Sequence, residues 1–377
     1  ADLGADVVKI ERPGAGDDTR GWGPPFARND QGETTDAAYY LCANRNKRSV
    51  AVDMAAPDGA ELIRRLARKA DIVLENFKPG GLKKYGLDYD ALRGINPRLV
   101  YCSITGFGYS GPYRERPGYD FIVQAMGGLM SATGEPKGEP MKAGVAVADL
   151  FAGMYAATSM LAALRHAERT GEGQHLDVAL YDCQIAMLAN LASGFLVSGE
   201  SPARYGNAHA SIVPYQAFAA ADHEIVVAVG NDGQFARFCE VIGAPALAAD
   251  ERFKKNRGRV EHRAALIPMI AERLKQRPAR DWLERLEAAG VPAGPVNTID
   301  RVFADPQTIA RGMTLMLERA DEAPERYVPH PVKYSGTPVP TGEAPPKLGE
   351  HTDDVMRELL GLDDGAVKSL RAKGVIG

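Results

Sequence analysis

The chain has 377 residues, with 45 Lys and Arg against 49 Asp and Glu, a formal net charge of -4 and 4 cysteines. That length suggests about two domains, and together with 45% hydrophobic residues it excludes a small disulfide scaffold and a disordered chain. The small net charge gives no reason to expect nucleic acid as a partner. With no run of about 18 apolar residues and no signal-peptide pattern, we expect no membrane partner and a cytoplasmic location, or a mitochondrial one in a eukaryote.

Predicted strands alternate with helices along the first part of the chain. Short apolar runs predict buried strands, and the spacing of Leu62, Ile63 and Leu66 predicts one face of an amphipathic helix. This alternation favours an α/β, Rossmann-like parallel sheet with helices on both faces. The opening ADLGADVVKIE has the pattern of a helix end entering a strand, so we also expect a strand and a helix ahead of residue 1. The predicted strands cover residues 6–11, 49–53, 71–75 and 99–104.

The pattern changes to helical at Asp149 and to a smaller α+β arrangement later in the chain. A helix rich in small residues is predicted from Asp149 to about Gly171, followed by a strand and a second helix. A hairpin and three further helices follow a turn-rich linker. The later elements are predicted over residues 174–179, 180–196, 215–231, 234–242, 259–275 and 279–289. We therefore predict a large domain over 1–200, a linker over 201–214, a small domain over 215–300 and a segment over 301–377 that returns to complete the large domain.

The motifs of several common enzyme classes are missing from the sequence. There is no dinucleotide-binding GxGxxG after the first strand, no Walker lysine motif and no G-x-S-x-G nucleophile turn. The four cysteines are widely spaced without a CxxC pair or a nearby His cluster, so we expect reduced thiols and no metal site. The glycine-rich loop GFGYSG at residues 106–111 is either a simple turn or a phosphate-binding loop.

Basic residues follow or precede several predicted strands. The segment 44–48 (NRNKR) precedes one strand, Lys9 and Arg12 accompany the first, and Lys78, Lys83 and Lys84 follow the third. Each cluster alone has the composition of a solvated surface. Ligands of open parallel sheets bind at the carboxyl ends of the strands, so the clusters taken together favour a phosphorylated ligand.

Asp149 lies between the apolar run AGVAVA and a helix of small residues. One interpretation is a helix N-cap, in which the carboxylate accepts amide hydrogens at the positive end of the helix dipole. The other is a nucleophilic carboxylate, because the neighbouring Ala and Gly residues would let a large ligand approach. Both interpretations stay open on the sequence alone.

A set of motifs in order resembles one family across essentially the whole chain. The motifs are ADLGADVVKIERPGAGDDTRGW, NRNKRSVAVDM, ADIVLENFKPG, the PGYD at 117–120, ADLFAGMYA around Asp149 and the terminal LGEHTDDV. They resemble the class III CoA-transferases (CaiB/BaiF type), a family whose relatives include formyl-CoA transferase and α-methylacyl-CoA racemase. Within the family, GNAHASIVPYQAF and IVVAVGNDGQF look most like the members that move CoA from succinyl-CoA to a dicarboxylate such as glutarate.

The resemblance implies a fold, an assembly and a set of site residues. It implies a Rossmann-like large domain, a smaller α+β domain, and two ring-like subunits interlocked in a homodimer. Coenzyme A or acyl-CoA would be a substrate, with no permanently bound cofactor and no metal. By motif position the catalytic residue is Asp149. The residues implied to contact CoA are Arg12, Val52, Asp53, Met54, Ala55, Asn76, Phe77, Lys78, Lys84 and Tyr119; Lys84 stands where close relatives carry an arginine.

The implied chemistry is attack of an aspartate on an acyl-CoA thioester. This gives a mixed anhydride and then an aspartyl-CoA thioester, from which the acceptor acid takes CoA. Racemases of the family carry a His at the position of Tyr119, and a phenol is a poor base at neutral pH, so transfer is favoured over racemisation. A racemase and a non-catalytic CoA-binding protein remain the alternatives.

Two further positions have two interpretations each. Gly206-Asn207 is a candidate lid or a plain turn, and His209 is a candidate carboxylate contact or a surface residue.

Overall fold

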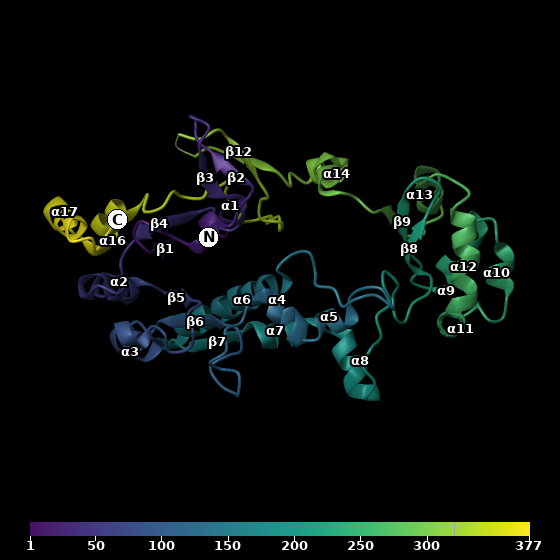
Figure 1. Cartoon of the computed structure of the whole chain (residues 1–377), viewed down its shortest axis with the longest axis horizontal. Helices are drawn as coiled ribbons and strands as arrows, with labels where there is room; N and C mark the ends of the chain where they lie inside the picture. Colours follow the sequence, from purple (N-terminus) through teal and green to yellow (C-terminus); the bar gives the residue numbers. More distant parts are fainter. Residues whose placement is uncertain (320) are drawn as a thin grey trace. The chain divides into compact units, whose positions relative to one another are not determined.

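The computed structural model describes residues 1–319 and 321–377 (Figure 1). Close contacts divide the chain into two compact units. The first contains Ala1–Pro117, Met154–Val178 and Ile299–Gly377, and the second contains Gly118–Gly153 and Ala179–Thr298. The boundary between Thr298 and Ile299 lies next to the predicted one at residue 300, whereas neither unit has a boundary at 200 or 214, and the predicted division into domains stays a prediction.

The first unit contains a parallel two-stranded sheet of β1 (Val7–Glu11) and β4 (Lys47–Ala51), in which Glu11 lies opposite Ala51. Helices α2 (Pro57–Lys69), α16 (Thr352–Leu360) and α17 (Asp364–Ala372) supply the apolar side chains that pack with β4. Leu62 of α2 is one of them, as its predicted helical face requires. The end of the chain is therefore part of the same core as its beginning.

A second sheet in this unit has the strand order β5-β6-β7. Strand β5 (Ile72–Glu75) is parallel to β6 (Val100–Thr105), and β7 (His175–Ala179) lies on the other side of β6. Helix α3 (Tyr89–Ile95) and the 3-10 turn η2 (Lys83–Tyr85) carry side chains of the cluster that packs with Tyr101 of β6. The parallel α/β character is as predicted, but within the described residues the strands form two separate sheets instead of one.

Smaller elements of the first unit connect its early and late segments. Tyr40 and Leu41 of α1 (Ala38–Leu41) share a hydrophobic cluster with Leu317 of β11 (Leu315–Leu317) and Tyr327 of β12 (Glu325–Tyr327). The sequence patterns predicted none of these short elements, because three to six residues carry too little periodicity to detect. They are η1 (Asp18–Gly21), β2 (Phe26–Arg28), β3 (Thr34–Ala37), α1 (Ala38–Leu41), α14 (Ile299–Ala304), α15 (Pro306–Ala310), β11 (Leu315–Leu317) and β12 (Glu325–Tyr327).

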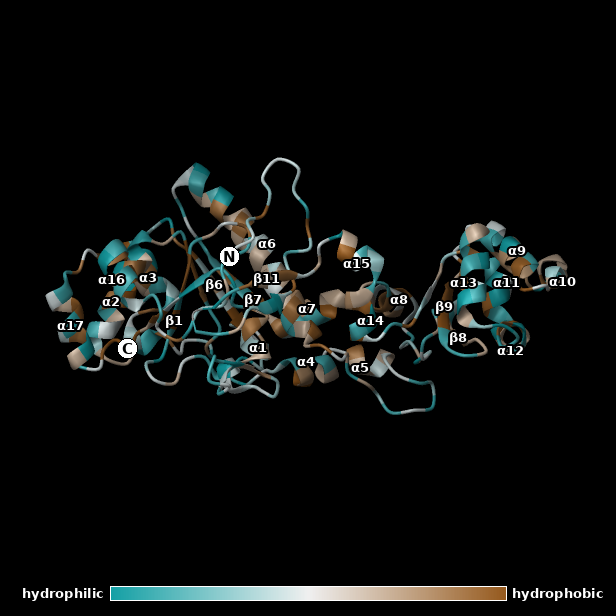
Figure 2. Ribbon diagram, turned by 90° about the horizontal axis from the view of Figure 1, so that it is seen from above, coloured by the Kyte–Doolittle hydropathy of each residue, from teal (hydrophilic) through white to brown (hydrophobic). Residues whose placement is uncertain are grey.

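The second unit begins with the short helices α4 (Asp120–Met126) and α5 (Leu129–Ala132). The single helix predicted over 180–196 is wrong: α7 (Leu180–Met187) and α8 (Asn190–Ser198) are bent by 77°. Ala189 between them has a φ of 45°, which a right-handed helix does not allow. Figure 2 shows the hydrophobic character of α7 and α8.

A separate hydrophobic core in the second unit lies within residues 213–291. It packs an antiparallel sheet of β8 (Tyr215–Ala219), β9 (Glu224–Ala228) and β10 (Ala293–Pro295) against helices. The helix predicted over 259–275 is in fact two helices that meet at His262, whose φ and ψ leave the helical region. The helices are α9 (Asp232–Val241), α10 (Pro245–Ala249), α11 (Asn256–Glu261), α12 (Arg263–Leu274) and α13 (Ala279–Ala288).

Helix α6 (Val147–Thr170) is the longest helix among the described residues, and its first seven residues belong to the second unit. It is long and apolar enough to cross a membrane by length and composition, with a mean hydropathy of 1.5 in its most apolar window. The helix has no run of 18 apolar residues because Asp149, Thr158, Ser159 and Arg165 interrupt it. Ala163 and Ala167 pack against Val100 in the first unit, but only 22% of the most apolar window is buried.

Candidate active site

The start of α6 is held by Asp120 and not by Asp149. The helix begins at Val147, so Asp149 is its third residue and lies too far along to be the N-cap. The backbone N–H of Ala148 donates to Asp120 Oδ1 at 2.8 Å, which satisfies one of the free amides of the first turn. The N-cap interpretation of Asp149 is therefore wrong, and its carboxylate is left for another role.

Asp120 is itself fixed by a neighbour one turn along α4. The Nε2 of Gln124 donates to Asp120 Oδ2 at 2.7 Å, and the Ala143 N–H donates to Gln124 Oε1 at 2.8 Å. Gln124 is fully buried. Both oxygens of Asp120 are thus occupied, and the segment that leads into α6 is tied to α4. The sequence analysis missed Asp120 and Gln124, although their i, i+4 spacing just after Tyr119 was a detectable signal.

The carboxylate of Asp149 has an unusual electrostatic environment. It forms no hydrogen bond or ion pair with any residue that the structure describes. Although the residue as a whole is exposed, desolvation by the surrounding protein and the negative charge of Asp120 raise its pKa to about 6. A carboxylate with this pKa is mostly ionised at neutral pH and is more basic than an ordinary Asp, which suits a nucleophile.

Tyr119 directly precedes α4 and is therefore adjacent in sequence to Asp120. Its side chain is 67% exposed. It belongs to the same unit as Asp149 and is available to a ligand from solvent.

The predicted residues Arg12 and Val52 to Ala55 lie in the first unit, at the carboxyl ends of the paired strands β1 and β4. The Val52 N–H donates to the Glu11 carbonyl at 2.9 Å, which sets Arg12 beside this segment. Asp53 Oδ1 accepts the Ala55 N–H at 2.9 Å, and this Asx turn leads into α2. A Cβ on Gly59 would lie 2.0 Å from the Asp53 carbonyl, so the helix can approach this closely only with glycine there.

The predicted residues Asn76, Phe77 and Lys78 follow β5 as an exposed turn, and Phe77 is 46% exposed. Lys84 is also exposed, with its ammonium 4.6 Å from the centroid of the Tyr85 ring. Met54 and Tyr85 pack against one hydrophobic cluster. The structure therefore brings the segment after β4 and the turn that carries Lys84 to the same part of the first unit.

Not all of the predicted basic clusters are free to bind phosphate. Lys9 is paired with Asp17 at 2.6 Å, and Arg48 is paired with Asp6 and Glu358. Arg45 is 9% exposed and paired with Asp2. Burial and the charge of Lys9 lower the pKa of Lys47 to about 8. The segment 44–48 is thus buried or half-buried and not a solvated surface. The exposed cations of these clusters are Lys78, Lys83, Lys84 and Arg12, which lies 3.9 Å from Asp18.

The predicted lid segment is tied to a neighbouring turn of the second unit. The Gly206 N–H donates to the Gly134 carbonyl at 3.0 Å, and Arg204 donates to the carbonyls of Glu135 and Gly138. The Nδ1 of His209 accepts the Ser211 N–H at 3.0 Å. One ring nitrogen of His209 therefore stabilises the local turn through this hydrogen bond.

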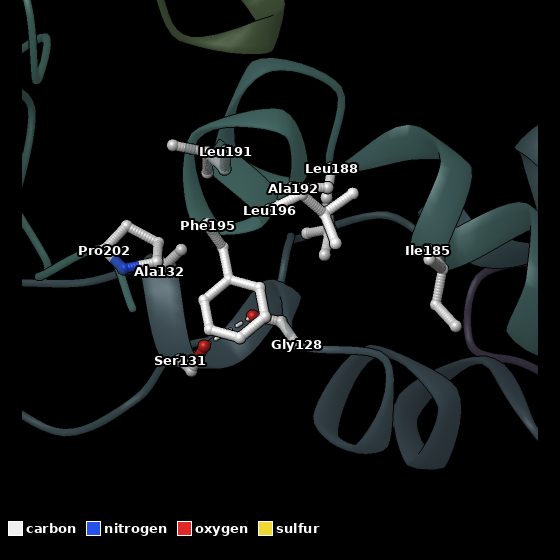
Figure 3. Close-up of a pocket in the computed structure, with 10 residues that line it drawn as sticks. All are labelled: Gly128, Ser131, Ala132, Ile185, Leu188, Leu191, Ala192, Phe195, Leu196 and Pro202. Atoms are coloured by element: carbon white, nitrogen blue, oxygen red, sulfur yellow. Dashed lines mark hydrogen bonds between the residues drawn. The ribbon is translucent and has the colours of Figure 1, made fainter. Parts of the chain in front are cut away.

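A pocket of about 250 Å³ lies between α5, α7 and α8 (Figure 3). Ser131 supplies the one polar side chain of its lining, and its hydroxyl donates to the Gly128 carbonyl at 2.7 Å. A dicarboxylate would find no charged partner here. The lining residues are Gly128, Ser131, Ala132, Ile185, Leu188, Leu191, Ala192, Phe195, Leu196 and Pro202. Among the described residues, no group of three His, Cys, Asp or Glu side chains is placed to hold a metal ion.

Comparison with known proteins identifies the family. The family model for CoA-transferase family III matches residues 1–352. A succinate–glutarate CoA-transferase from Agrobacterium fabrum is 52% identical over 359 residues, which cover 95% of this chain and 90% of that protein. The human succinyl-CoA:glutarate CoA-transferase is 42% identical over 376 residues, covering 100% of this chain and 84% of the human protein.

A solved structure gives the same result for the fold. The crystal structure of a CAIB/BAIF family protein from Brucella suis is 50% identical, with a TM-score of 0.84 over 95% of this chain and 93% of that one. Sequence and fold therefore agree with the motifs over nearly the full chain, and the protein belongs to the CoA-transferase family III and is a transferase enzyme.

Proposed function

We propose that this enzyme moves CoA from succinyl-CoA to glutarate. The observation that carries this proposal is the 52% identity to a succinate–glutarate CoA-transferase over 95% of the chain. The human protein of the same described activity supports it at 42% identity over the whole chain. A dicarboxylic donor and acceptor also agree with the sequence motifs GNAHASIVPYQAF and IVVAVGNDGQF.

In the proposed mechanism Asp149 is the nucleophile. An oxygen of its carboxylate attacks the thioester carbonyl of succinyl-CoA, and the carbon–sulfur bond breaks to release CoA thiolate and leave a mixed anhydride. The thiolate attacks the aspartyl carbonyl, frees succinate and forms an aspartyl-CoA thioester. Glutarate attacks that thioester to give a second anhydride, and CoA then takes the glutaryl group and restores Asp149. The raised pKa of Asp149 and its lack of a hydrogen-bonded partner among the described residues support this role.

Asp120 supports the nucleophile in two ways in this mechanism. Its hydrogen bond to the Ala148 N–H fixes the first turn of α6, so the Asp149 backbone does not have to be ordered during the reaction. Its negative charge also raises the pKa of Asp149, which increases the basicity of the attacking oxygen.

Since anhydrides hydrolyse readily, the assembled site has to exclude water, and Gly206-Asn207 is the segment we propose as its cover.

We assign CoA recognition to residues of the first unit, all of them exposed except Val52, which is buried, and Asp53 and Met54, which are half-buried. The cations Arg12, Lys78 and Lys84 would pair with phosphate oxygens, as charge-assisted hydrogen bonds favour. The segment Val52 to Ala55 would border the nucleotide, and the exposed ring of Phe77 offers an apolar contact. Tyr119, in the second unit, would contact the acyl end. No metal takes part in this proposal.

We also propose that the enzyme works as a homodimer in the cytoplasm. Large apolar side chains are exposed on α6 and α8, and a second copy of the chain would remove them from water. Met154 is 68% exposed, and Leu196 and Val197 of α8 are 80% and 90% exposed. Light scattering after size-exclusion chromatography tests the dimer directly, because a mass of one chain would contradict it.

Mass spectrometry of the thioesters tests the proposed function. The enzyme is incubated in deuterated water with succinyl-CoA and a panel of free acids, and in parallel with a 2-methylacyl-CoA. We expect glutaryl-CoA to form without deuterium at the α-carbon. Deuterium in an otherwise unchanged 2-methylacyl-CoA would favour a racemase instead, and no new thioester at all would contradict CoA transfer.

The variant Asp149→Asn separates the catalytic role from binding. We expect turnover to fall by about 10³-fold or more, since the amide is not a nucleophile, with CoA binding and the folded structure unchanged. Hydroxylamine added to the wild type with succinyl-CoA should trap Asp149 as a hydroxamate, which peptide mapping identifies. Full turnover by Asp149→Asn would contradict the mechanism without contradicting the family.

A further inference from the structure

The glycine-rich loop at residues 106–111 has no part in the mechanism proposed above, and two of its backbone amides already have hydrogen-bond acceptors within the chain. The Gly108 N–H donates to Thr105 Oγ1 and the Tyr109 N–H donates to Asp177 Oδ2, each at 2.9 Å. Gly108 and Gly111 have φ values of 86° and 84°, which glycine adopts without a steric penalty. The loop is therefore a tight turn held by side chains of its own unit, and these two amides are not available to cradle a phosphate.

This turn directs Tyr109 toward the end of strand β5. The phenol oxygen lies 3.2 Å from Glu75 Oε1, and the other oxygen of the same carboxylate accepts the Phe77 N–H at 2.7 Å. Glu75 is 8% exposed. One buried carboxylate therefore joins the phenol of the glycine-rich loop to the backbone of the exposed turn that carries Asn76, Phe77 and Lys78.

The phenol of Tyr109 is held in a partly buried position. Burial and the negative charge of Glu75 raise its pKa, against the hydrogen bond from Ser103, which favours the phenolate. The phenol is therefore protonated at neutral pH and can donate to Glu75 at 3.2 Å. The start of the turn after β5 is thus linked, through Glu75, to a side chain from another part of the chain.

A second layer fixes the position of Tyr109. Ser103 Oγ donates to the Tyr109 oxygen at 3.3 Å and lies 2.9 Å from His175 Nε2. The His175 ring meets the Tyr109 ring edge to face, with centroids 5.0 Å apart, and stacks on the Tyr89 ring at 5.3 Å. These residues come from β6, β7 and α3, which lie together in Figure 1. Because these neighbours surround Tyr109, its side chain is already fixed in one orientation before any ligand binds.

We infer that Tyr109, acting through Glu75, is a positioning residue for CoA binding. This inference rests on the proposed function, in which the turn of Asn76, Phe77 and Lys78 contacts CoA. An exposed turn would lose conformational freedom on binding a ligand, and anchoring it beforehand removes that cost from the affinity. The role concerns binding alone, because Tyr109 belongs to a different unit from Asp149 and makes no contact with the reacting atoms in this proposal.

The variant Tyr109→Phe removes the hydroxyl and keeps the ring. We expect the Kd for CoA, measured by titration calorimetry, and the KM for succinyl-CoA to rise about three- to tenfold, the worth of one hydrogen bond, with kcat within twofold of the wild type. Tyr113→Phe, two residues beyond the glycine-rich loop, is the matched control. Its hydroxyl has no hydrogen bond with the described residues, so CoA binding should not change. A lower melting temperature with an unchanged Kd in Tyr109→Phe would show a purely structural role and overturn the inference.

Lys78→Ala distinguishes this inference from the function on which it rests. If CoA fails to bind the wild type, or binds Lys78→Ala with wild-type affinity, the assignment of the turn to CoA is wrong. If Lys78→Ala weakens binding but Tyr109→Phe does not, the assignment stands and the inference fails. If both weaken binding, we expect the double variant to lose less than the product of the two single effects, because both act on one turn. Strictly multiplicative losses would contradict an action of Tyr109 through that turn.

Discussion

Glu11 and Asp149 are both carboxylates whose pKa is affected by desolvation, but the pKa of Glu11 is lowered and that of Asp149 is raised. Glu11, in the first unit, accepts hydrogen bonds from Arg20 at 2.7 and 2.9 Å and from Ser49 at 2.6 Å. Burial alone would raise its pKa, but these bonds and the Arg20 charge outweigh burial and hold the pKa below its ordinary value. Asp149 has no such cation among the described residues, and burial with the Asp120 charge raises its pKa to about 6. A compensated carboxylate stabilises the fold, whereas an uncompensated one is available for chemistry.

The compensated site should be the more sensitive one for stability. Arg20 also contacts Asp36 at 3.0 Å and lies 3.8 Å from the centroid of the Tyr40 ring, so Arg20→Met leaves two buried carboxylates without this partner. We expect the free energy of unfolding at pH 7 to fall by about 3–5 kcal/mol, measured by urea unfolding. The exposed pair of Arg252 and Asp250 is the control, and Arg252→Met should produce no measurable change.

Acid provides a second check on Arg20→Met. A carboxyl whose pKa is depressed in the folded protein stabilises it above the unfolded pKa, here 4.5 for Glu11, and loses that contribution as the pH falls through the folded value. The difference between wild type and Arg20→Met should therefore shrink below about pH 4. A difference that stayed constant down to pH 3 would mean that packing and not charge is responsible.

Removing the charge of Asp149, the carboxylate without a cationic partner, should increase the free energy of unfolding instead of lowering it. A carboxyl with a raised pKa in the folded protein favours folding when it is protonated, so its ionisation at pH 8 costs stability. Asp149→Asn removes that cost, and we expect a gain of about 1 kcal/mol at pH 8, once the screening of an exposed carboxylate by water is allowed for. Unfolding should show the gain shrinking as the pH falls below 6 and disappearing below about pH 3, where Asp149 is protonated in both the folded and the unfolded state. A destabilised Asp149→Asn would mean that the carboxylate has a partner after all.

The smallest expected effect is that of Asp120→Asn, which removes the charge but keeps an oxygen to accept the Ala148 N–H. The pKa of Asp149 should fall by up to about one unit, because the like charge is gone. Since the nucleophile acts ionised, the acid limb of the pH profile of kcat/KM should move to lower pH by the same amount. Asp120→Ala should in addition lose about 1 kcal/mol of stability with the cap. An unmoved acid limb in Asp120→Asn would assign the raised pKa to burial alone.

Strong local patterns predicted the elements of the fold that build the sheets. The apolar runs before Glu11, Glu75 and Thr105 were identified as strands to within two residues, because a buried strand needs a continuous apolar run. The breaks at Ala189 and His262 carry no Pro or Gly. Since nothing in their local sequence forbids a helix, only packing of the surrounding chain decides that the helices end there.

The candidate site was also predicted only in part from the sequence. The motifs around Asp149, Arg12 and Asn76 were sufficient to identify the family, which the comparisons confirm. Which residue caps α6, which cations are free and which are paired could not be predicted, because each depends on partners distant in sequence. Asp120 reaches Ala148 across 28 residues, and Arg48 reaches Glu358 across 310.

The sequence by itself determined the main sheet strands and the family, since both follow from residue types at short spacings. The tertiary structure alone decided the charge state of the buried groups, because a pKa depends on burial and on the distance to other charges. That is why Asp149, an ordinary aspartate in the sequence, has a raised pKa, while Glu11 has a lowered one. It is also why Tyr109 in a glycine-rich loop came to hold the turn after β5: only the folded chain brings residues 75 and 109 within 3.2 Å.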